Sequence, residues 1–312
     1  MDALSDILSH VKFRGSLYFT TEFSAPWGID VPSFSNVARF HLVMRGNCFV
    51  RVNGSEEAVE LFPGDFIVIP HGAAHELLDC ADGKVVVLDR VLEESGYDGK
   101  GHLAYGLKDQ GEETRLICGH FAFDSSSRHP MLGELPDSIV VRSQCDTTQS
   151  WLEASFKLLE AEYAATRLGN EAIINRMTEI LFVQAIRDWL ERREVDAGVL
   201  KALGDQKIGR ALAAVHREPS QRWTVESMAR EAGLSRTVFA KRFQELADTT
   251  PMNYVTSWRL EKARALLVGC NDSIEEVAAQ VGYRSVAAFS RIFSRHLGIG
   301  PGALRRSRRE AA

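Results

Sequence analysis

The sequence predicts a two-domain α+β protein with an N-terminal β-barrel, a helical linker and a C-terminal all-α domain. Short apolar segments alternate with turn signals over residues 38–89, which is typical of a small barrel or sandwich. Apolar side chains recur at helical spacing over residues 148–193, and residues 205–312 contain one helical pattern twice. We therefore place the boundaries of three segments at 1–136, 137–204 and 205–312.

The N-terminal domain should begin with a short helix at residues 5–10. Predicted strands follow at residues 38–44, 48–52, 66–69 and 84–89. The strand at 66–69 consists only of apolar residues, so we expect it to be buried on both faces. Several short strands between turns favour a closed or two-layered β-structure.

One spaced motif in this region is more specific: Gly64-x5-Pro70-x-Gly72-x2-His75-x3-Asp79. It resembles the second sequence motif of cupins at every fixed position except the last, where Asn is usual. The N-terminal domain is therefore identified as a cupin-like barrel by resemblance, which implies a role in binding a small-molecule effector.

The resemblance also predicts that the barrel lacks a metal. Metal-bearing cupins use two His and a Glu of a first motif together with the His of the second. Here Arg39 takes the place of the Glu, residues 32–35 contain no histidine, and only His75 remains. One imidazole cannot hold a metal ion, so we expect no metal, no cofactor and no enzyme activity. Arg39, His41 and His75 are candidate effector-binding residues; regrouping of His41, His71 and His75 around an ion is an alternative.

Residues 93–115 are rich in glycine and charge and predict a loop, either a flap over a ligand or a surface excursion. Two helices are predicted beyond the barrel, at about 148–167 and 170–193, from the spacing of their apolar residues. These helices either pack on the barrel or form the interface of a homodimer.

The C-terminal segment repeats one pattern, in predicted helix-turn-helix motifs at about 224–246 and 273–296. With a shift of 49 and then 50 residues, the copies match at Val225 and Ile274, Met228 and Val277, Ala229 and Ala278, Gly233 and Gly282, Phe239 and Phe289, Lys241 and Arg291, Phe243 and Phe293, and Pro251 and Pro301. Two such motifs in tandem are a much stronger signal than one.

Each copy has the local chemistry of a helix-turn-helix. Gly233 and Gly282 stand where the first helix must end in a left-handed conformation, which glycine adopts without penalty. Ser235 and Ser285 can then cap the second helix. A helix from Pro251 to about Leu267 should connect the two motifs.

Charge is distributed unevenly along the chain. Residues 205–312 hold 18 Lys and Arg against 11 Asp and Glu, whereas residues 1–204 hold 19 against 31. A basic domain joined to an acidic one is typical of nucleic-acid binders. No apolar run approaches the ~18 residues of a membrane span, and the five cysteines show no CxxC spacing. We expect reduced thiols, no membrane association and a cytoplasmic location.

The repeat resembles the DNA-binding domain of AraC/XylS-family transcription regulators. The motifs are Ala232-Gly-Leu-Ser-Arg-Thr-Val-Phe-Ala-Lys-Arg-Phe243 and Val281-Gly-Tyr-Arg-Ser-Val-Ala-Ala-Phe-Ser-Arg-Ile-Phe293, and each has a Pro eight residues after its last Phe. The resemblance implies a regulator that binds double-stranded DNA, dimerises and contacts RNA polymerase under effector control. It assigns DNA contacts to Arg236, Thr237, Ala240, Lys241 and Gln244 in the first motif, and to Ser285, Ala287, Ala288 and Arg291 in the second.

Two alternatives remain open. A redox-sensing regulator of the same family would use oxidation of Cys48, Cys80, Cys118 or Cys145 in place of a ligand. A cupin enzyme with an accessory DNA-binding domain is the second alternative, and it would require a bound metal.

Overall fold

The computed structural model divides the chain into two compact units, Phe13–Arg192 and Met1–Lys12 together with Arg193–Ala312. The N-terminal helix therefore belongs to the same unit as the C-terminal helices. The structure describes residues 3–11, 13–52, 54–99, 102–106, 111–123, 130–143, 149–164, 167–192 and 198–311.

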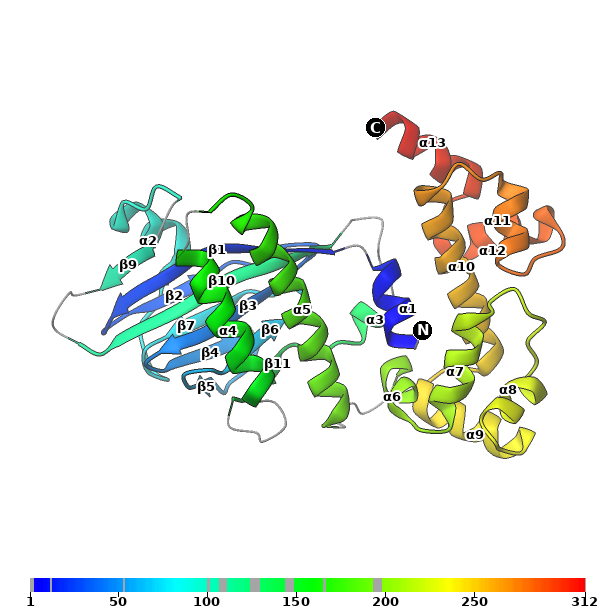
Figure 1. The fold of residues 1–312 in the computed structure, drawn as a ribbon, viewed down its shortest axis with the longest axis horizontal. Coiled ribbons are helices and arrows are strands. Elements are labelled where there is room, and N and C mark those ends of the chain that lie inside the picture. The colour runs from blue at the N-terminus through cyan, green and yellow to red at the C-terminus, as the bar shows by residue number, and fades with distance from the viewer. Residues whose placement is uncertain are drawn as a thin grey trace. The chain divides into compact units, whose positions relative to one another are not determined.

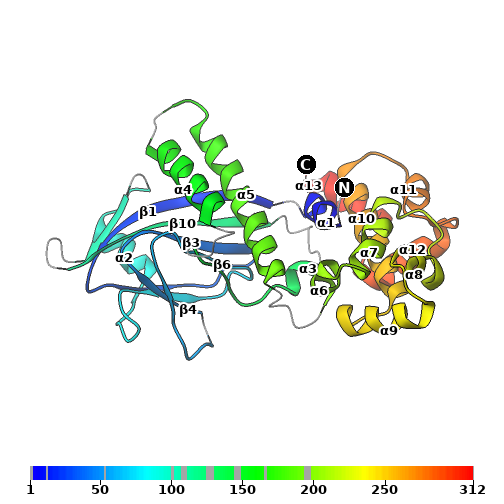
Figure 2. The same ribbon diagram turned by 60° about the horizontal axis from the view of Figure 1, so that its bottom comes forward.

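The first unit is a β-structure of two facing sheets (Figures 1 and 2). Its strands are β1 (Phe13–Ser24), β2 (Gly28–Val31), β3 (Val37–Arg45), β4 (Cys48–Val52), β5 (Val59–Leu61), β6 (Phe66–Ile69), β7 (His75–Leu78), β8 (Val86–Val87), β9 (His102–Gly106), β10 (Glu113–Phe123) and β11 (Ile139–Val141). The larger sheet has the order β11-β6-β3-β10-β1-β9, and the smaller has the order β5-β4-β7-β2-β8.

An apolar core fills the space between the two sheets. It contains inward-facing side chains of both, among them Phe23, Ile67 and Leu116 from the larger sheet and Leu77 from the smaller. All four residues of β6 are buried, as the uninterrupted apolar sequence predicted. The barrel prediction is confirmed in its architecture.

Two sequence predictions within this unit are wrong. Residues 93–115 are not one loop, because they include the end of α2 (Leu88–Ser95), all of β9 and the start of β10. One glycine of this stretch marks a strand end rather than a flap: a Cβ at Gly106 would lie 1.9 Å from the Ser24 carbonyl oxygen on β1. The predicted strand at 84–89 is reduced to Val86–Val87, since α2 begins at Leu88.

Two helices beyond the sheets, α4 (Gln149–Ala164) and α5 (Asn170–Glu191), agree closely with the predicted pair, whereas α3 (Pro130–Gly133) is a single short turn. Helix α5 packs on β1 and β11 of the larger sheet. The ring of Phe182 is fully buried there, with centroids 5.1 Å from Phe13 and 4.7 Å from Phe121. Helix α5 therefore packs on the barrel, as one of the two alternatives predicted, and α4 packs on α5.

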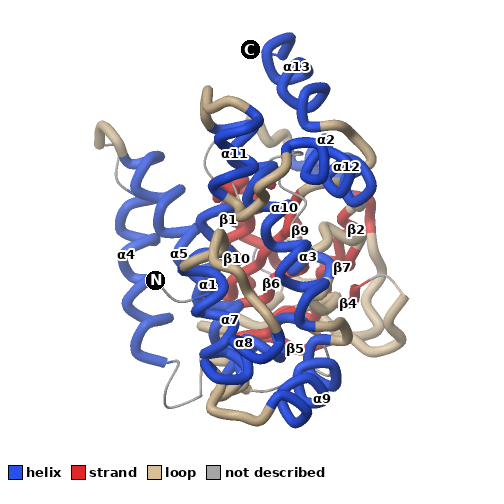
Figure 3. The backbone as a smooth tube through the Cα atoms, turned by 90° about the vertical axis from the view of Figure 1, so that its right-hand side faces the viewer, coloured by secondary structure: helices blue, strands red, loops and turns tan. Residues whose placement is uncertain are grey.

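The second unit is all-α (Figure 3). Its helices are α1 (Ala3–His10), α6 (Val199–Gly204), α7 (Ile208–Arg217), α8 (Val225–Glu231), α9 (Arg236–Ala247), α10 (Pro251–Gly269), α11 (Ile274–Gln280), α12 (Val286–Leu297) and α13 (Pro301–Ala311). Helix α10 has 19 residues and connects the two helix-turn-helix motifs, α8–α9 and α11–α12, as predicted. None of the described helices is long and apolar enough to cross a membrane.

The predicted helix caps are present in both motifs. The hydroxyl oxygens of Ser235 and Ser285 accept hydrogen bonds from the backbone N–H groups of Val238 and Ala288. Gly233 and Gly282 have φ values of +65° and +86°, in the left-handed region expected for them. The local chemistry of these residues therefore produces the two turns.

Helix α1 has a partner that the sequence did not reveal. Its Ile7 side chain is fully buried, and α1 packs against α7. Asp6 lies 3.0 Å from Nδ1 of His216 on α7, and both side chains are almost completely buried. The Nε2 atom of the same imidazole hydrogen-bonds the hydroxyl of Tyr254 on α10. A buried pair spanning 210 positions of sequence thus fixes the N-terminal helix to the all-α unit.

Candidate nucleic-acid interface and barrel pocket

The second helices of the two motifs, α9 and α12, present the candidate DNA contacts. Each helix has 12 residues, and each buries a Phe pair on its inner face, Phe239 with Phe243 and Phe289 with Phe293. The opposite faces are left to solvent. The candidates Arg236, Thr237, Lys241, Gln244, Ser285, Ala287 and Arg291 are exposed, and Ala240 and Ala288 are half-buried.

The basic side chains on the two helices differ in their ion pairing. Arg236 pairs with Glu226 across the turn of the first motif, at 2.5 Å. Lys241 lies 3.8 Å from Glu245 on the same helix. Arg291 has no ion pair within the described part of the chain. Its guanidinium is therefore available to a phosphate or a guanine edge without first leaving a protein carboxylate.

The structure aligns α12 with α9 residue by residue and so identifies which positions of the second motif correspond to the candidate DNA contacts of the first. Since α9 and α12 begin 50 residues apart, Ser285 is the counterpart of the capping residue Ser235. The counterparts of Ala240 and Gln244 are Ser290 and Ser294, which our sequence reasoning did not include. The 50-residue shift was visible in the sequence and would have located both.

Arg259 on α10 connects the two motifs. Its Nε donates to the Pro219 carbonyl at 2.7 Å, and its Nη2 donates to the Gln221 carbonyl at 2.6 Å, both in the loop before α8. Its guanidinium also lies 6.0 Å from the centroid of the Tyr283 ring, in the turn before α12. Burial lowers the pKa of Arg259, which reflects its partial dehydration among these contacts. The residue couples the first motif's loop to the second motif's turn.

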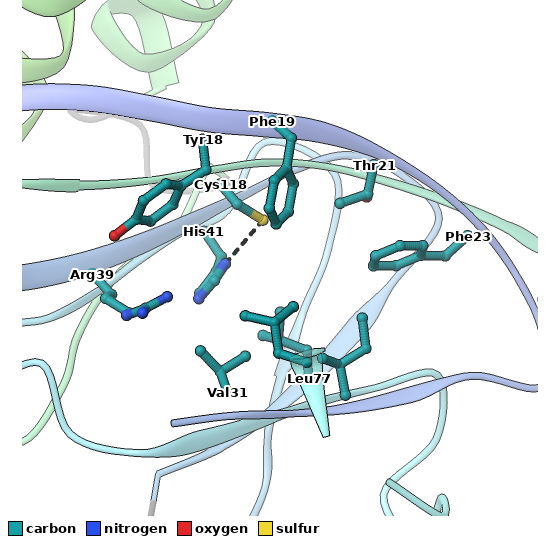
Figure 4. A pocket seen from close by; sticks show the side chains of 11 residues that line it. Tyr18, Phe19, Thr21, Phe23, Val31, Arg39, His41, Leu77 and Cys118 are labelled. Atoms are coloured by element: carbon teal, nitrogen blue, oxygen red, sulfur yellow. Dashed lines mark hydrogen bonds between the residues drawn. The ribbon is translucent and has the colours of Figure 1, made fainter. Parts of the chain in front are cut away.

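The interior of the barrel contains a small pocket between the two sheets (Figure 4). The lining combines aliphatic and aromatic side chains with a few polar ones: Tyr18, Phe19, Thr21, Phe23, Ile29, Val31, Arg39, His41, Leu77, Leu88 and Cys118. Two of the three candidate effector-binding residues, Arg39 and His41, are among them and point into the same space. The third, His75, contacts His41 from the opposite sheet.

A chain of hydrogen bonds links these side chains. Nδ1 of His75 lies 2.9 Å from the Ala73 carbonyl, which can only accept, so this nitrogen carries the proton. Its Nε2 must then accept from Nε2 of His41, at 2.8 Å. Nδ1 of His41 is left as an acceptor for the thiol of Cys118, at 3.1 Å. Every link is satisfied with both imidazoles neutral.

Burial supports the same protonation states. It lowers the pKa of His75 to about 4 and the pKa of His41 well below its ordinary value. His71, the third histidine of the alternative metal set, instead bonds the Leu135 carbonyl at 2.8 Å. Across the described ranges, no group of three or more His, Cys, Asp or Glu residues is arranged to hold a metal ion.

Three of the described cysteines have thiols that are held in their protonated form. Burial raises the pKa of Cys48 to about 12 and also raises the pKa of Cys118. A hydrogen bond with Asp79 raises the pKa of the exposed Cys80. A raised pKa lowers the fraction of each thiol present as the reactive thiolate. Cys145 lies outside the described residues.

Comparison with known proteins assigns both units to families. A family described as Cupin matches residues 2–191, and one described as Helix-turn-helix domain matches residues 228–307. The chain belongs to the AraC-like transcriptional regulators with an N-terminal cupin domain. It is therefore a DNA-binding transcription regulator, as the tandem motifs predicted.

Relatives align along the whole chain. The HTH-type transcriptional regulator AlkR of Acinetobacter baylyi is 29% identical over 304 residues, covering 96% of this chain and 98% of the relative. A putative AraC-like transcription regulator of Streptomyces lividans is 29% identical over 310 residues, covering 98% of each chain.

Solved structures resemble this AraC-like regulator in whole or in part. The DNA-binding domain of AdpA, in complex with a target DNA, is 32% identical, with a TM-score of 0.32, and covers 32% of this chain and 91% of its own. ToxT of Vibrio cholerae, bound to an unsaturated fatty acid, is 12% identical, with a TM-score of 0.36, and covers 93% of each chain.

Proposed function

We propose that this regulator changes its binding to operator DNA when a small-molecule effector occupies the barrel pocket. The observation that carries the proposal is the pairing of two structures in one chain. One is a pocket between the sheets that contains the buried polar side chains Arg39 and His41. The other is a pair of exposed helices, α9 and α12, suited to major grooves. An effector that favours one arrangement of the two units would alter DNA affinity.

Helix α10 supports a bipartite mode of DNA binding. Its 19 residues span ~28 Å at 1.5 Å per residue. This length allows α9 and α12 to enter successive major grooves, about one duplex turn or ~34 Å apart. We infer that one protomer covers two adjacent major-groove segments and that a homodimer covers two such pairs.

The surface of α4 and α5 supports the dimer. Leu159 and Leu181 are buried, whereas the adjacent Leu158 and Ile180 are 62% and 55% exposed. Exposed large apolar side chains on packed helices are suited to a second copy of the chain. RNA polymerase would be a further partner once the dimer is on DNA.

Operator binding by single variants tests the proposed reading helices. Operators selected from random duplexes would be varied one base pair at a time. Arg291→Ala should cost ~1–3 kcal/mol and relax the preference at one base pair, because its neighbours Ala287 and Ala288 cannot form hydrogen bonds. Lys241→Ala should weaken binding evenly and reduce the salt slope by about one unit.

Arg187→Ala is the matched control, since it removes an exposed arginine from α5 of the barrel unit. If Arg291→Ala weakens all operator variants equally, α12 contacts phosphate only and does not read bases. If Arg187→Ala has the same effect as Arg291→Ala, α12 is not the DNA-binding surface of the second motif.

A further inference from the structure

Arg39 is a buried cation without a counterion among the described residues of the barrel. The residue is 5% exposed, and its Nε is buried from solvent and has no hydrogen-bond partner within that part of the chain. No described residue forms an ion pair or a hydrogen bond with its guanidinium. The only groups whose negative forms act on it electrostatically within the described residues are Tyr18 and Cys118, and neither is a carboxylate. Burial of an unpaired charge costs free energy, and an anionic ligand that pairs with the guanidinium would offset that cost.

The surroundings of Arg39 leave one side open to a ligand. Its guanidinium lies 4.2 Å from the ring centroid of Phe34 and 5.3 Å from that of Tyr18. These rings hold its flat faces by cation–π contacts, which leave the N–H groups at its edge free to donate. Figure 4 shows that edge directed toward His41, inside the pocket.

A second unsatisfied nitrogen lies on the neighbouring strand. His120 on β10 is the direct cross-strand partner of Arg39 on β3. Its Nδ1 is buried without a hydrogen-bond partner among the described residues, and its ring stacks on the pocket-lining Tyr18 with centroids 4.5 Å apart. On β10, His120 shares a face with the pocket-lining Cys118, two positions before it. Arg39 and His120 thus each carry such a nitrogen, at paired positions of adjacent strands.

The rest of the pocket is mostly apolar. Beyond Arg39 and His41, the hydroxyls of Tyr18 and Thr21 and the thiol of Cys118 are its polar groups, and the remaining wall consists of Phe19, Phe23, Ile29, Val31, Leu77 and Leu88. A phosphate would need several further donors, which this wall does not offer. A cation would be repelled by Arg39. A ligand with a carboxylate on a compact apolar body would match the pocket, because the carboxylate pairs with Arg39 and the body packs on the apolar wall.

We propose that the effector of this regulator is a small apolar monocarboxylic acid, whose carboxylate pairs with Arg39 and whose apolar body lies against the inner walls of the two sheets. This inference rests on the proposed effector control and names the chemical class of the effector. His120 is a second donor to the same carboxylate when Nδ1 carries its proton.

Entry requires the pocket to open, since its present volume of about 20 Å³ holds about one water molecule. The two aromatic rings over Arg39 are suited to this movement. Tyr18 is 37% exposed and Phe34 is 46% exposed, so both can rotate outward without disturbing the core. The carboxylate would replace the cation–π contacts that they make with the guanidinium.

The test is thermal melting of the full-length protein with matched ligand pairs. Benzoate and hexanoate are compared with their neutral amides, benzamide and hexanamide, and with inorganic phosphate. The acids should raise the melting temperature in proportion to the logarithm of their concentration, whereas the amides and phosphate should not. Arg39→Met should weaken binding of the acid about tenfold or more, because a charge-assisted hydrogen bond is lost.

Two features keep the test decisive if a variant is damaged. Arg39→Met should melt at or above the wild-type temperature without ligand, since it replaces an unpaired buried charge by an apolar chain of similar length. Arg45→Met on the same strand is the matched control, because Arg45 is exposed and already paired with Glu113. It should bind the acids as the wild type does.

Three results would overturn the inference: equal stabilisation by an acid and its amide, no stabilisation by any acid of the panel, or equal acid binding by Arg39→Met and the wild type. Operator binding on the same samples separates this inference from the proposed function. Acid bound through Arg39 without any change in DNA affinity would support a carboxylate site at Arg39 and refute its role in effector control. A response of DNA affinity to the neutral amides alone would support effector control and refute the carboxylate.

Discussion

Gly233 and Gly282 occupy equivalent turns, yet the structure predicts different costs for the same substitution. Both have positive φ, so the left-handed conformation costs alanine ~1–2 kcal/mol at either position. A Cβ at Gly233 would meet nothing within 4 Å. A Cβ at Gly282 would lie 2.9 Å from the Ser220 carbonyl oxygen and 2.9 Å from Nη2 of Arg259.

The neighbours of Gly282 cannot move easily. The Ser220 oxygen is backbone, and the Arg259 guanidinium is held by two hydrogen bonds to the same loop. Overpacking of this kind costs a further ~1–3 kcal/mol. We therefore expect Gly282→Ala to destabilise the second motif by ~2–5 kcal/mol in all, against ~1–2 kcal/mol for Gly233→Ala in the first.

Native-state hydrogen exchange of the full-length protein measures the stability lost in each motif separately. Peptides from α8–α9 report on Gly233→Ala, and peptides from α11–α12 report on Gly282→Ala. Asparagine provides a second comparison, since it tolerates positive φ but still carries a Cβ. Gly233→Asn should be nearly neutral, whereas Gly282→Asn should remain strongly destabilised. If the two asparagine variants lose stability equally, the close approach of the Ser220 loop does not constrain the second motif.

Three buried polar contacts give further predictions. The pKa of His75 is about 4 in the folded barrel and ~6.5 when unfolded, so the unfolded state binds more protons between these values. The free energy of unfolding of the barrel should therefore fall by about 3 kcal/mol as the pH falls from ~6.5 to about 4. Denaturant titrations at each pH measure this loss, and His75→Leu should abolish most of it. Asp6→Ala should destabilise the all-α unit by ~3–5 kcal/mol, as loss of one partner of a buried pair does, and exchange rates in α7 equal to those of the wild type would refute the docking of α1. Cys118→Ala should cost ~1–3 kcal/mol by leaving His41 without its donor, and Cys118→Ser should restore part of it, whereas equal losses would show that the thiol contributes only packing.

The sequence by itself determined the parts of this protein that depend on neighbours within a few residues. Ser235, Ser285 and the two turn glycines act on backbone groups only a few positions away, so both helix-turn-helix motifs could be located from the order of residues alone. The uninterrupted apolar run of β6 also predicted its burial. The loop predicted for 93–115 was wrong because glycine content does not distinguish a flap from a strand end that approaches a neighbouring strand closely.

The tertiary structure decided what depends on residues far apart in the chain. The sequence singled out Arg39 and His75 through their places in the cupin motifs and named His41 as a further candidate. Only the pairing of β3 with β10 and the facing of the two sheets bring His41 to Cys118 and to His75. The same holds for Asp6 and His216, and for Arg259, whose carbonyl partners lie about 40 residues earlier. Such contacts leave no periodic pattern in the sequence. The properties of a buried charge or histidine depend on its neighbours in space, and only the fold determines those neighbours.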